Sequence, residues 1–243
     1  MSLPKARSIM SDSENNPEFK TQQELVYHQL REAILRGKFK PGNSVTLRGI
    51  AAMLGVSLMP VRDSLRRLTT ERALQLLENR RIAVPEMSPD KLEEIYQART
   101  ALECLAATRA LPFIDDKAIA ELEVLNNKHN LAISCGDVEN YIYINFQFHR
   151  KIYSYGQPQA LMPLIESLWL QIAPFMQSIF AQIKAADALS QGNDQHRQAL
   201  DAIKAKDAKL LEQVIRADIL DGAIGLQQAK GWPLSGHTSL LNA

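Results

Sequence analysis

The chain has 243 residues, of which 46% are hydrophobic and 23% are charged. This composition is ordinary for a globular protein of one or two domains that buries a sizeable core. No stretch approaches the roughly 18 consecutive apolar residues that span a membrane, and no apolar signal-peptide block is visible. We therefore expect a cytoplasmic protein without a membrane partner.

The charge is divided unevenly along the chain. Residues 1–86 carry 14 Lys and Arg against 9 Asp and Glu, a net charge of +5, whereas residues 87–243 carry 14 against 18, a net charge of −4. A basic module joined to a mildly acidic one is typical of a protein whose first part approaches a polyanion such as DNA.

The first ordered elements are predicted to be two helices. Residues 1–20 are polar and lack periodicity, so we expect a disordered arm there. Apolar residues at helical spacing then predict a first helix over residues 21–37. A second, short helix is predicted over residues 47–54, with Thr46 as its N-cap.

The run Gly55–Leu68 combines a turn, a helix start and a basic helix face. Gly55 can take the left-handed conformation that ends the preceding helix, Ser57 can cap the next one, and Pro60 falls in its first turn. Val61, Leu65 and Leu68 form the buried stripe. The outward positions are Ser57, Met59, Arg62, Arg66 and Arg67. An arginine-bearing face of this kind favours insertion into the major groove of DNA.

A β-hairpin is predicted after this helix. Two short apolar runs, residues 74–77 and 82–84, flank a polar tip at residues 78–81. Three helices and a hairpin indicate a winged helix-turn-helix over residues 21–86.

The remainder of the chain predicts an all-helical domain. From residue 87 to residue 231 the period is 3.6 residues without a further strand signal, and a tail follows at residues 232–243. One helix is expected to be long, over residues 159–183. Cys104 and Cys135 predict buried free thiols rather than a disulfide or metal pair. The expected fold is therefore mostly α, with an antiparallel six-helix bundle after the winged helix-turn-helix.

Three stretches carry a resemblance to a known family: Leu30–Gly42, Gly55–Leu68 and Arg99–Ala106. In these the chain resembles the GntR family of bacterial transcription regulators, in the FadR-type branch with an FCD effector domain. The resemblance implies a homodimer that sets two recognition helices about one DNA turn apart on a palindromic operator. It also implies a small effector, bound in the bundle, that changes the spacing or angle of those helices.

The resemblance further implies which side chains meet DNA. They are Arg48 on the second helix, Ser57 and Arg62 on the recognition helix, and Asn79 and Arg80 at the wing tip. Two further outward arginines, Arg66 and Arg67, either contact phosphates or form a solvated helix face.

The recognition helix departs from the family pattern at two positions. Leu58 and Met59 stand where the family usually has arginine and threonine. Either Arg62 and the wing carry more of the recognition, or Leu58 and Met59 make apolar contact with thymine methyl groups. Arg81 stands where the family has glycine and adds a positive charge to the wing.

A metal site in the bundle is also implied by the resemblance. Family members with a metal use an aspartate and a histidine on one helix and a histidine on each of two later helices. The matching positions here are Asn145, His149, His196 and Asp218. Asparagine is the weaker ligand, but Asp218 restores a carboxylate, and such a set suits divalent zinc, nickel or manganese. The alternative is that these are hydrogen-bonded core residues without a metal.

Arg99 occupies the family's effector-facing arginine position and is the candidate for binding a small carboxylate by a bidentate pair. The alternative is an intrahelical ion pair with Glu103. Tyr96, Tyr141 and Trp169 either line the same cavity or belong to the plain core.

We expect a ligand-responsive regulator rather than an enzyme. A metal-free regulator that senses its ligand through Arg99 and hydrogen bonds is one alternative. A metal-dependent helical-bundle enzyme is another, although the paired Glu-x-x-His motifs of carboxylate-bridged bundles are missing from the sequence.

Overall fold

The computed structural model describes residues 21–180 and 195–233 of the chain. The arm predicted at residues 1–20 and most of the tail predicted at residues 232–243 lie outside these described ranges.

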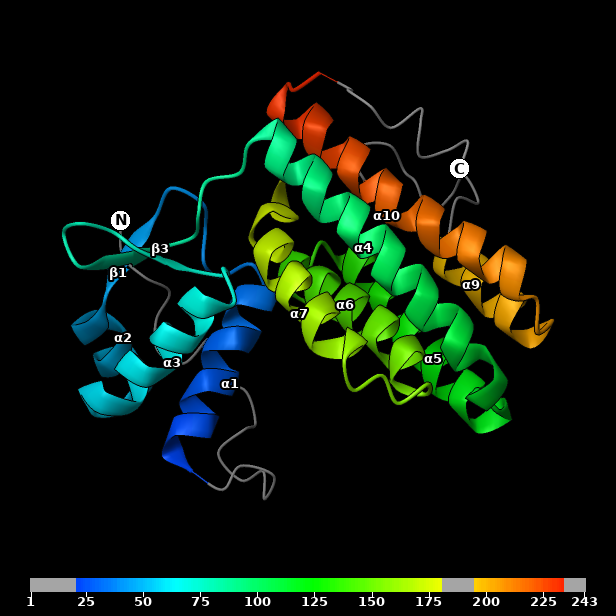
Figure 1. Cartoon of the computed structure of the whole chain (residues 1–243), viewed down its shortest axis with the longest axis horizontal. Helices are drawn as coiled ribbons and strands as arrows, with labels where there is room; N and C mark the ends of the chain where they lie inside the picture. The colour runs from blue at the N-terminus through cyan, green and yellow to red at the C-terminus, as the bar shows by residue number, and fades with distance from the viewer. Residues whose placement is uncertain (1–20, 181–194, 234–243) are drawn as a thin grey trace. The chain divides into compact units, whose positions relative to one another are not determined.

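The chain divides into two compact units (Figure 1). The first comprises residues 1–86 together with Leu170–Pro174, and the second comprises Met87–Trp169 and Phe175–Ala243. Each unit is built around its own apolar core, and each is considered separately below.

The first unit contains the predicted helices and hairpin. Its elements are α1 (Gln22–Leu35), β1 (Ser44–Thr46), α2 (Leu47–Leu54), α3 (Leu58–Thr70), β2 (Gln75–Leu76) and β3 (Arg81–Ala83). The three strands form an antiparallel sheet in the order β1-β3-β2. The winged helix-turn-helix architecture is confirmed.

Local hydrogen bonds explain where these helices begin and end. The side chain of Thr46 accepts a hydrogen bond from the backbone N–H of Gly49, so the predicted cap of α2 is confirmed. Gly55 ends α2 in the left-handed conformation, at a φ of 65°. Ser57 occupies the N-cap position of α3, but its side chain makes no capping hydrogen bond. Ser57 is therefore the N-cap residue by position, as predicted, but the predicted capping hydrogen bond of its side chain is not formed.

Strand β1 is absent from the sequence-based prediction. It has three residues and pairs with β3, with Val45 opposite Ile82. A three-residue strand between a turn and a helix is too short to show an alternating pattern, and long-range pairing alone defines it.

The core of the first unit forms where α1 packs against α3. The predicted stripe of Val61, Leu65 and Leu68 is buried, as are Leu30 and Ile34 on α1. This packing fixes α3 by its apolar side and leaves its opposite side exposed.

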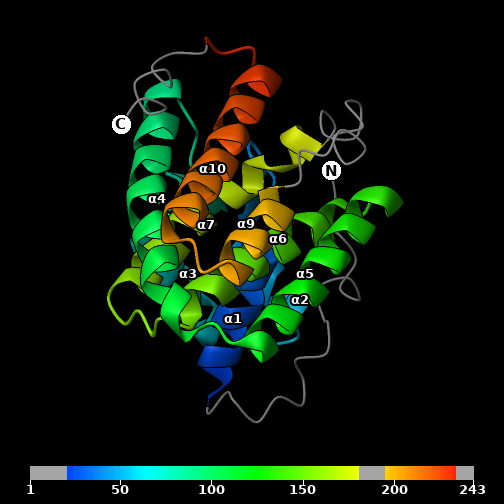
Figure 2. The same cartoon turned by 90° about the vertical axis from the view of Figure 1, so that its right-hand side faces the viewer.

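The second unit is all-helical in its described residues. Its elements are α4 (Pro89–Ala110), η3 (Leu111–Phe113), α5 (Asp116–Cys135), α6 (Val138–Ser154), most of α7 (Leu161–Ile172), α9 (Gln195–Lys204) and α10 (Ala208–Lys230). The end of α7 and the start of the 3₁₀ helix η4 (Ala173–Phe175) form the segment Leu170–Pro174 that is assigned to the first unit. Helices α4 and α10 run side by side, and α5 packs along α6 (Figures 1 and 2). The predicted class, mostly α with a helical second part, is confirmed.

Two details of the second unit differ from expectation. The long helix predicted over residues 159–183 is interrupted within its described residues, which end at 180, because α7 ends at Ile172 and a 3₁₀ turn containing Pro174 follows. Proline lacks the N–H that an α-helix needs and its ring clashes with the preceding turn. Cys104 is buried as predicted, but Cys135, the last residue of α5, is exposed.

Along the described ranges, none of the helices is both long and apolar enough to cross a membrane.

Candidate nucleic-acid interface and metal centre

The outer side of α3 carries the side chains that the sequence assigns to DNA recognition. The exposed residues of this side are Ser57, Leu58, Met59, Arg62 and Arg66, and Arg48 is exposed on the preceding helix α2. On α2 and α3 the winged helix-turn-helix therefore exposes three arginines, the Ser57 hydroxyl and two apolar side chains.

Arg67 lies apart from this surface and has a packing role. Its guanidinium stacks over the ring of Tyr27 at 3.7 Å, and its Nε donates to Oε1 of Glu71 at 3.1 Å. The hydroxyl of Tyr27 also donates to Glu71, at 2.8 Å. The guanidinium of Arg67 thus connects α3 to α1, while its side chain remains 60% exposed. Contact of Arg67 with a DNA phosphate stays a prediction.

The wing tip is shaped by its own hydrogen bonds. Arg80 is exposed and adopts the left-handed conformation, with a φ of 60°. The side-chain oxygen of Asn79 accepts from the backbone N–H of Arg81 at 3.0 Å. The guanidinium of Arg81 donates through Nε to the hydroxyl of Ser44 at 2.7 Å and through Nη2 to the Ser44 carbonyl. Arg81 therefore braces the hairpin against β1, a role that its expected extra charge did not suggest.

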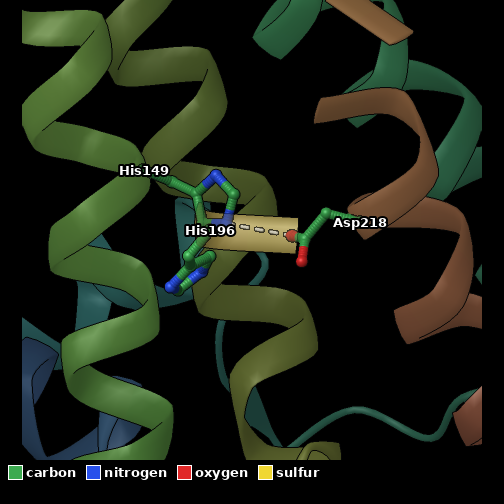
Figure 3. A group of neighbouring side chains, drawn as sticks. All are labelled: His149, His196 and Asp218. Atoms are coloured by element: carbon green, nitrogen blue, oxygen red, sulfur yellow. Dashed lines mark ion pairs between the residues drawn. The ribbon is translucent and has the colours of Figure 1, made fainter. Parts of the chain in front are cut away.

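In the second unit, His149 of α6, His196 of α9 and Asp218 of α10 converge on one point (Figure 3). One ligand atom from each lies within 4.8 Å of the others. Nε2 of His149 is 2.9 Å from Oδ2 of Asp218. Both histidines are buried, and the Asp218 side chain is 24% exposed. The structure thus brings together three of the four side chains predicted as ligands.

Asn145, the fourth predicted ligand, lies against His196, with its Oδ1 2.9 Å from Nε2 of the ring. An amide oxygen accepts but does not donate, so Nε2 carries the hydrogen and Nδ1 keeps its lone pair. Nδ1 is buried and has no hydrogen-bond partner within the described part of the chain. The pKa of His196 lies well below its ordinary value, mainly because the ring is buried and further because of the charges of His129 and His149. The ring is therefore neutral.

The hydrogen bonds of Tyr153 orient His149. The Tyr153 hydroxyl donates to Oε2 of Glu103 at 2.9 Å, so it accepts from Nδ1 of His149 at 3.2 Å. Nε2 of the ring is thereby directed at Asp218. Burial raises the pKa of Asp218, but the charge of His149 and its hydrogen bond outweigh burial and hold that pKa below its ordinary value. Asp218 is therefore an anion facing the two imidazoles.

Glu103 is a buried hydrogen-bond acceptor next to the site, and sequence reasoning placed it only in an alternative. It is fully buried and accepts from Nε of Arg99 at 2.6 Å, from the Tyr153 hydroxyl and from Nε1 of Trp169 at 3.2 Å. The guanidinium of Arg99 also stacks over the Trp169 ring at 4.1 Å. The Arg99–Glu103 ion pair is thus present, and its i, i+4 spacing was the signal that pointed to it.

The residues predicted to bind an effector adjoin the histidines, since the ring centre of Trp169 lies 5.8 Å from that of His149. Tyr96 and Trp169 lie beside Arg99, whose guanidinium is 5.3 Å from the Tyr96 ring centre. Tyr141 instead contacts His129 at 5.0 Å between ring centres. His129, which the sequence analysis missed, lies 4.5 Å from the ring of His196. A single histidine on α5 carries no sequence signal that would place it there.

Two family models match the chain. Residues 22–84 match the description "Bacterial regulatory proteins, gntR family", and residues 94–221 match the FCD domain. The first match spans the winged helix-turn-helix, and the second spans the helices that hold the histidines and Asp218.

Similar proteins have comparable length. The HTH-type transcriptional regulator McbR of Escherichia coli is 32% identical over 182 residues, which is 75% of this chain and 82% of that protein. The gluconate operon transcriptional repressor of Bacillus subtilis is 25% identical over 207 residues, 81% of each chain. A solved structure described as E. coli McbR/YncC superposes with a TM-score of 0.81 at 28% identity, covering 87% of this chain and 100% of that chain.

Proposed function

Since the chain belongs to the GntR family of bacterial transcription regulators and carries an FCD domain, we propose that a small carboxylate effector, bound with the help of a divalent metal, controls its affinity for operator DNA. The relatives are named as transcriptional regulators and repressors, so the interpretation as a regulator rather than an enzyme is confirmed. The regulatory switch, its metal and its effector are the proposal.

The observation that carries the proposal is the convergence of His149, His196 and Asp218 in the helical unit. Metal-binding histidines usually donate their second ring N–H to a neighbouring acceptor, which fixes the ring. Here Nδ1 of His149 is bonded to Tyr153 and Nε2 of His196 to Asn145. Nδ1 of His196 is left for a ligand, and Nε2 of His149, which faces Asp218 at 2.9 Å, would release its proton to bind a metal. Two imidazoles and one carboxylate suit zinc, nickel or manganese. In this proposal Asn145 orients His196.

The charges near this centre explain why the effector would be an anion. Arg99 and Glu103 neutralise each other, and Nε of Arg99 is already engaged. A metal would bind both imidazoles in their neutral form, because a ligating nitrogen carries no proton, so the single charge of Asp218 against a divalent cation would leave a net charge of about +1. A bound metal would supply this positive charge, and a carboxylate would compensate it. Arg99 and Trp169 would then shape the surroundings of the effector rather than grip its carboxylate.

For DNA binding, the proposal is that a homodimer binds a palindromic operator. Two copies of α3 about one DNA turn apart would read the two half-sites in the major groove. The name of the Bacillus subtilis relative, a repressor of a gluconate operon, supports repression as the mode of action and a carboxylate as the effector class.

The test of the proposal measures operator affinity in the presence of candidate effectors. Operator fragments are first enriched from a random duplex library with the full chain. Their affinity is then measured with sugar acids, amino acids and aromatic acids, using zinc-loaded protein and chelator-treated protein. We expect one class to change operator affinity by roughly 5- to 150-fold, only with metal. A response that survives chelation would support the metal-free alternative, and no response to any acid would contradict effector control.

Arg62→Ala is expected to weaken operator binding by about 1–3 kcal/mol and to relax sequence preference, because Arg62 is exposed on the outer side of α3. Fluorescence anisotropy with operator and scrambled duplexes at fixed salt measures both effects. Arg109→Ala, at an exposed arginine of α4, is the matched control and should leave both affinities unchanged. An unaltered operator-to-scrambled ratio for Arg62→Ala would remove this residue from base recognition.

A further inference from the structure

Two consecutive apolar side chains stand exposed at the start of α3. Leu58 is 38% exposed and Met59 is 62% exposed, while Pro60 and Val61, the next two residues, are buried. Among the exposed large apolar side chains of the described residues, only Leu58 and Met59 are adjacent in sequence. Met59 is mostly exposed and Leu58 is more than a third exposed, so part of their apolar surface is available to a partner outside the chain.

The surroundings of this pair indicate a polyanion as that partner. The exposed neighbours on α2 and α3 are Arg48, Ser57, Arg62 and Arg66. The Ser57 hydroxyl makes no capping bond and is free to donate to a phosphate or a base edge. An apolar protein partner would offer no counter-charge to the three exposed arginines. DNA phosphates would pair with them.

The major-groove edges of the bases offer one apolar group, the C5 methyl of thymine. We propose that Leu58 and Met59 read thymine methyl groups, so that each operator half-site carries thymine at the base pairs that face the first turn of α3. This inference rests on the proposed binding of operator DNA through α3. Arg62 and Ser57 would fix the position of the helix, and the apolar pair would set which bases are accepted there.

The side-chain chemistry also sets the size of the effect. Removing one buried methyl group from such a contact is expected to lower affinity by about fourfold. Methionine is unbranched and adapts to its contact, so Met59 should tolerate a thymine on either strand better than the branched Leu58.

Replacing thymine by uracil tests the inference directly, because uracil keeps every hydrogen-bonding group and removes only the methyl. The enriched operator duplex is synthesised with thymine and with uracil at each position in turn, and anisotropy gives both affinities at one salt concentration. For the wild-type chain we expect a loss of about fourfold at each contacted thymine and none elsewhere.

Variants assign the effect to the apolar pair. Met59→Gln and Leu58→Asn should bring the thymine-to-uracil affinity ratio toward one at the contacted positions. Leu131→Gln, at a side chain of α5 that is 61% exposed, is the matched control and should keep the wild-type ratio. Circular dichroism checks that each variant is folded. If a variant does not fold, the comparison of thymine and uracil duplexes with the wild-type chain still tests whether thymine methyl groups are read.

The possible failures are distinguishable. If the library yields no enriched sequence, both the proposed operator binding and this inference fail. If an operator is enriched but wild-type protein binds its thymine and uracil forms equally, thymine-methyl reading is overturned and operator binding stands. A Met59→Gln, Leu58→Asn double variant that keeps the wild-type ratio would overturn the assignment of that reading to these two residues.

Discussion

Replacing Glu103 with leucine is expected to destabilise the helical unit by about 3–5 kcal/mol, because it leaves the guanidinium of Arg99 buried without its counter-charge. Glu103 and Arg99 are both buried, and the Nε–Oε1 distance between them is 2.6 Å. The same substitution removes the acceptor of the Tyr153 hydroxyl and of the Trp169 indole N–H. Urea unfolding followed by circular dichroism measures the loss.

An exposed ion pair of the same spacing serves as the control. Arg216 and Glu212 on α10 are also four residues apart and partly exposed, with 3.0 Å between Nη2 and Oε1. Glu212→Leu should therefore cost no more than about 1 kcal/mol. Combining Glu103→Leu with Arg99→Met removes both buried charges and should recover much of the stability. Equal costs for Glu103→Leu and Glu212→Leu would contradict a stabilising role for the buried network.

The winged helix-turn-helix is predictable because its signals are local. Thr46 caps α2, Gly55 ends it, and the stripe on α3 has helical spacing, so each boundary is marked by residues close to it. Strand β1 had no such mark, because its pairing partner lies almost 40 residues away in β3. The break after α7 was marked by Pro174, and giving this proline more weight than the apolar period would have predicted it.

The candidate site is only partly predictable for a related reason. His149, His196 and Asp218 come from three helices, and only the family resemblance linked them before the structure placed them together. The acceptor role of Glu103 depends on donors from α4, α6 and α7 that packing brings together. The position of His129 against His196 is likewise a tertiary contact. Residue type alone suggests candidate ligands, but the partner of each hydrogen bond can be identified only from the folded structure.

His149→Ala combined with His196→Ala is expected to abolish binding of a divalent ion to the helical unit, because it removes two of the three converging side chains. Calorimetric titration with zinc should show a loss of affinity of more than roughly 100-fold, since even residues behind the ligands contribute 10- to 100-fold. Elemental analysis of chelator-free protein measures the metal content. The control is His28→Gln, an exposed histidine of α1.

Two variants that remove the hydrogen-bond partners of the histidines test whether these partners orient the rings for metal binding. Tyr153→Phe keeps both imidazoles but removes the hydroxyl that accepts from Nδ1 of His149, and Asn145→Leu removes the acceptor of Nε2 of His196. Each should weaken zinc binding by roughly 10- to 100-fold through loss of ring orientation. Asn145→Asp keeps an acceptor and adds a charge, so it should bind zinc at least as tightly as wild type. Equal metal content in wild type and in the double histidine variant, or no metal in either, would contradict metal binding by His149, His196 and Asp218. These three side chains would then be hydrogen-bonded core residues.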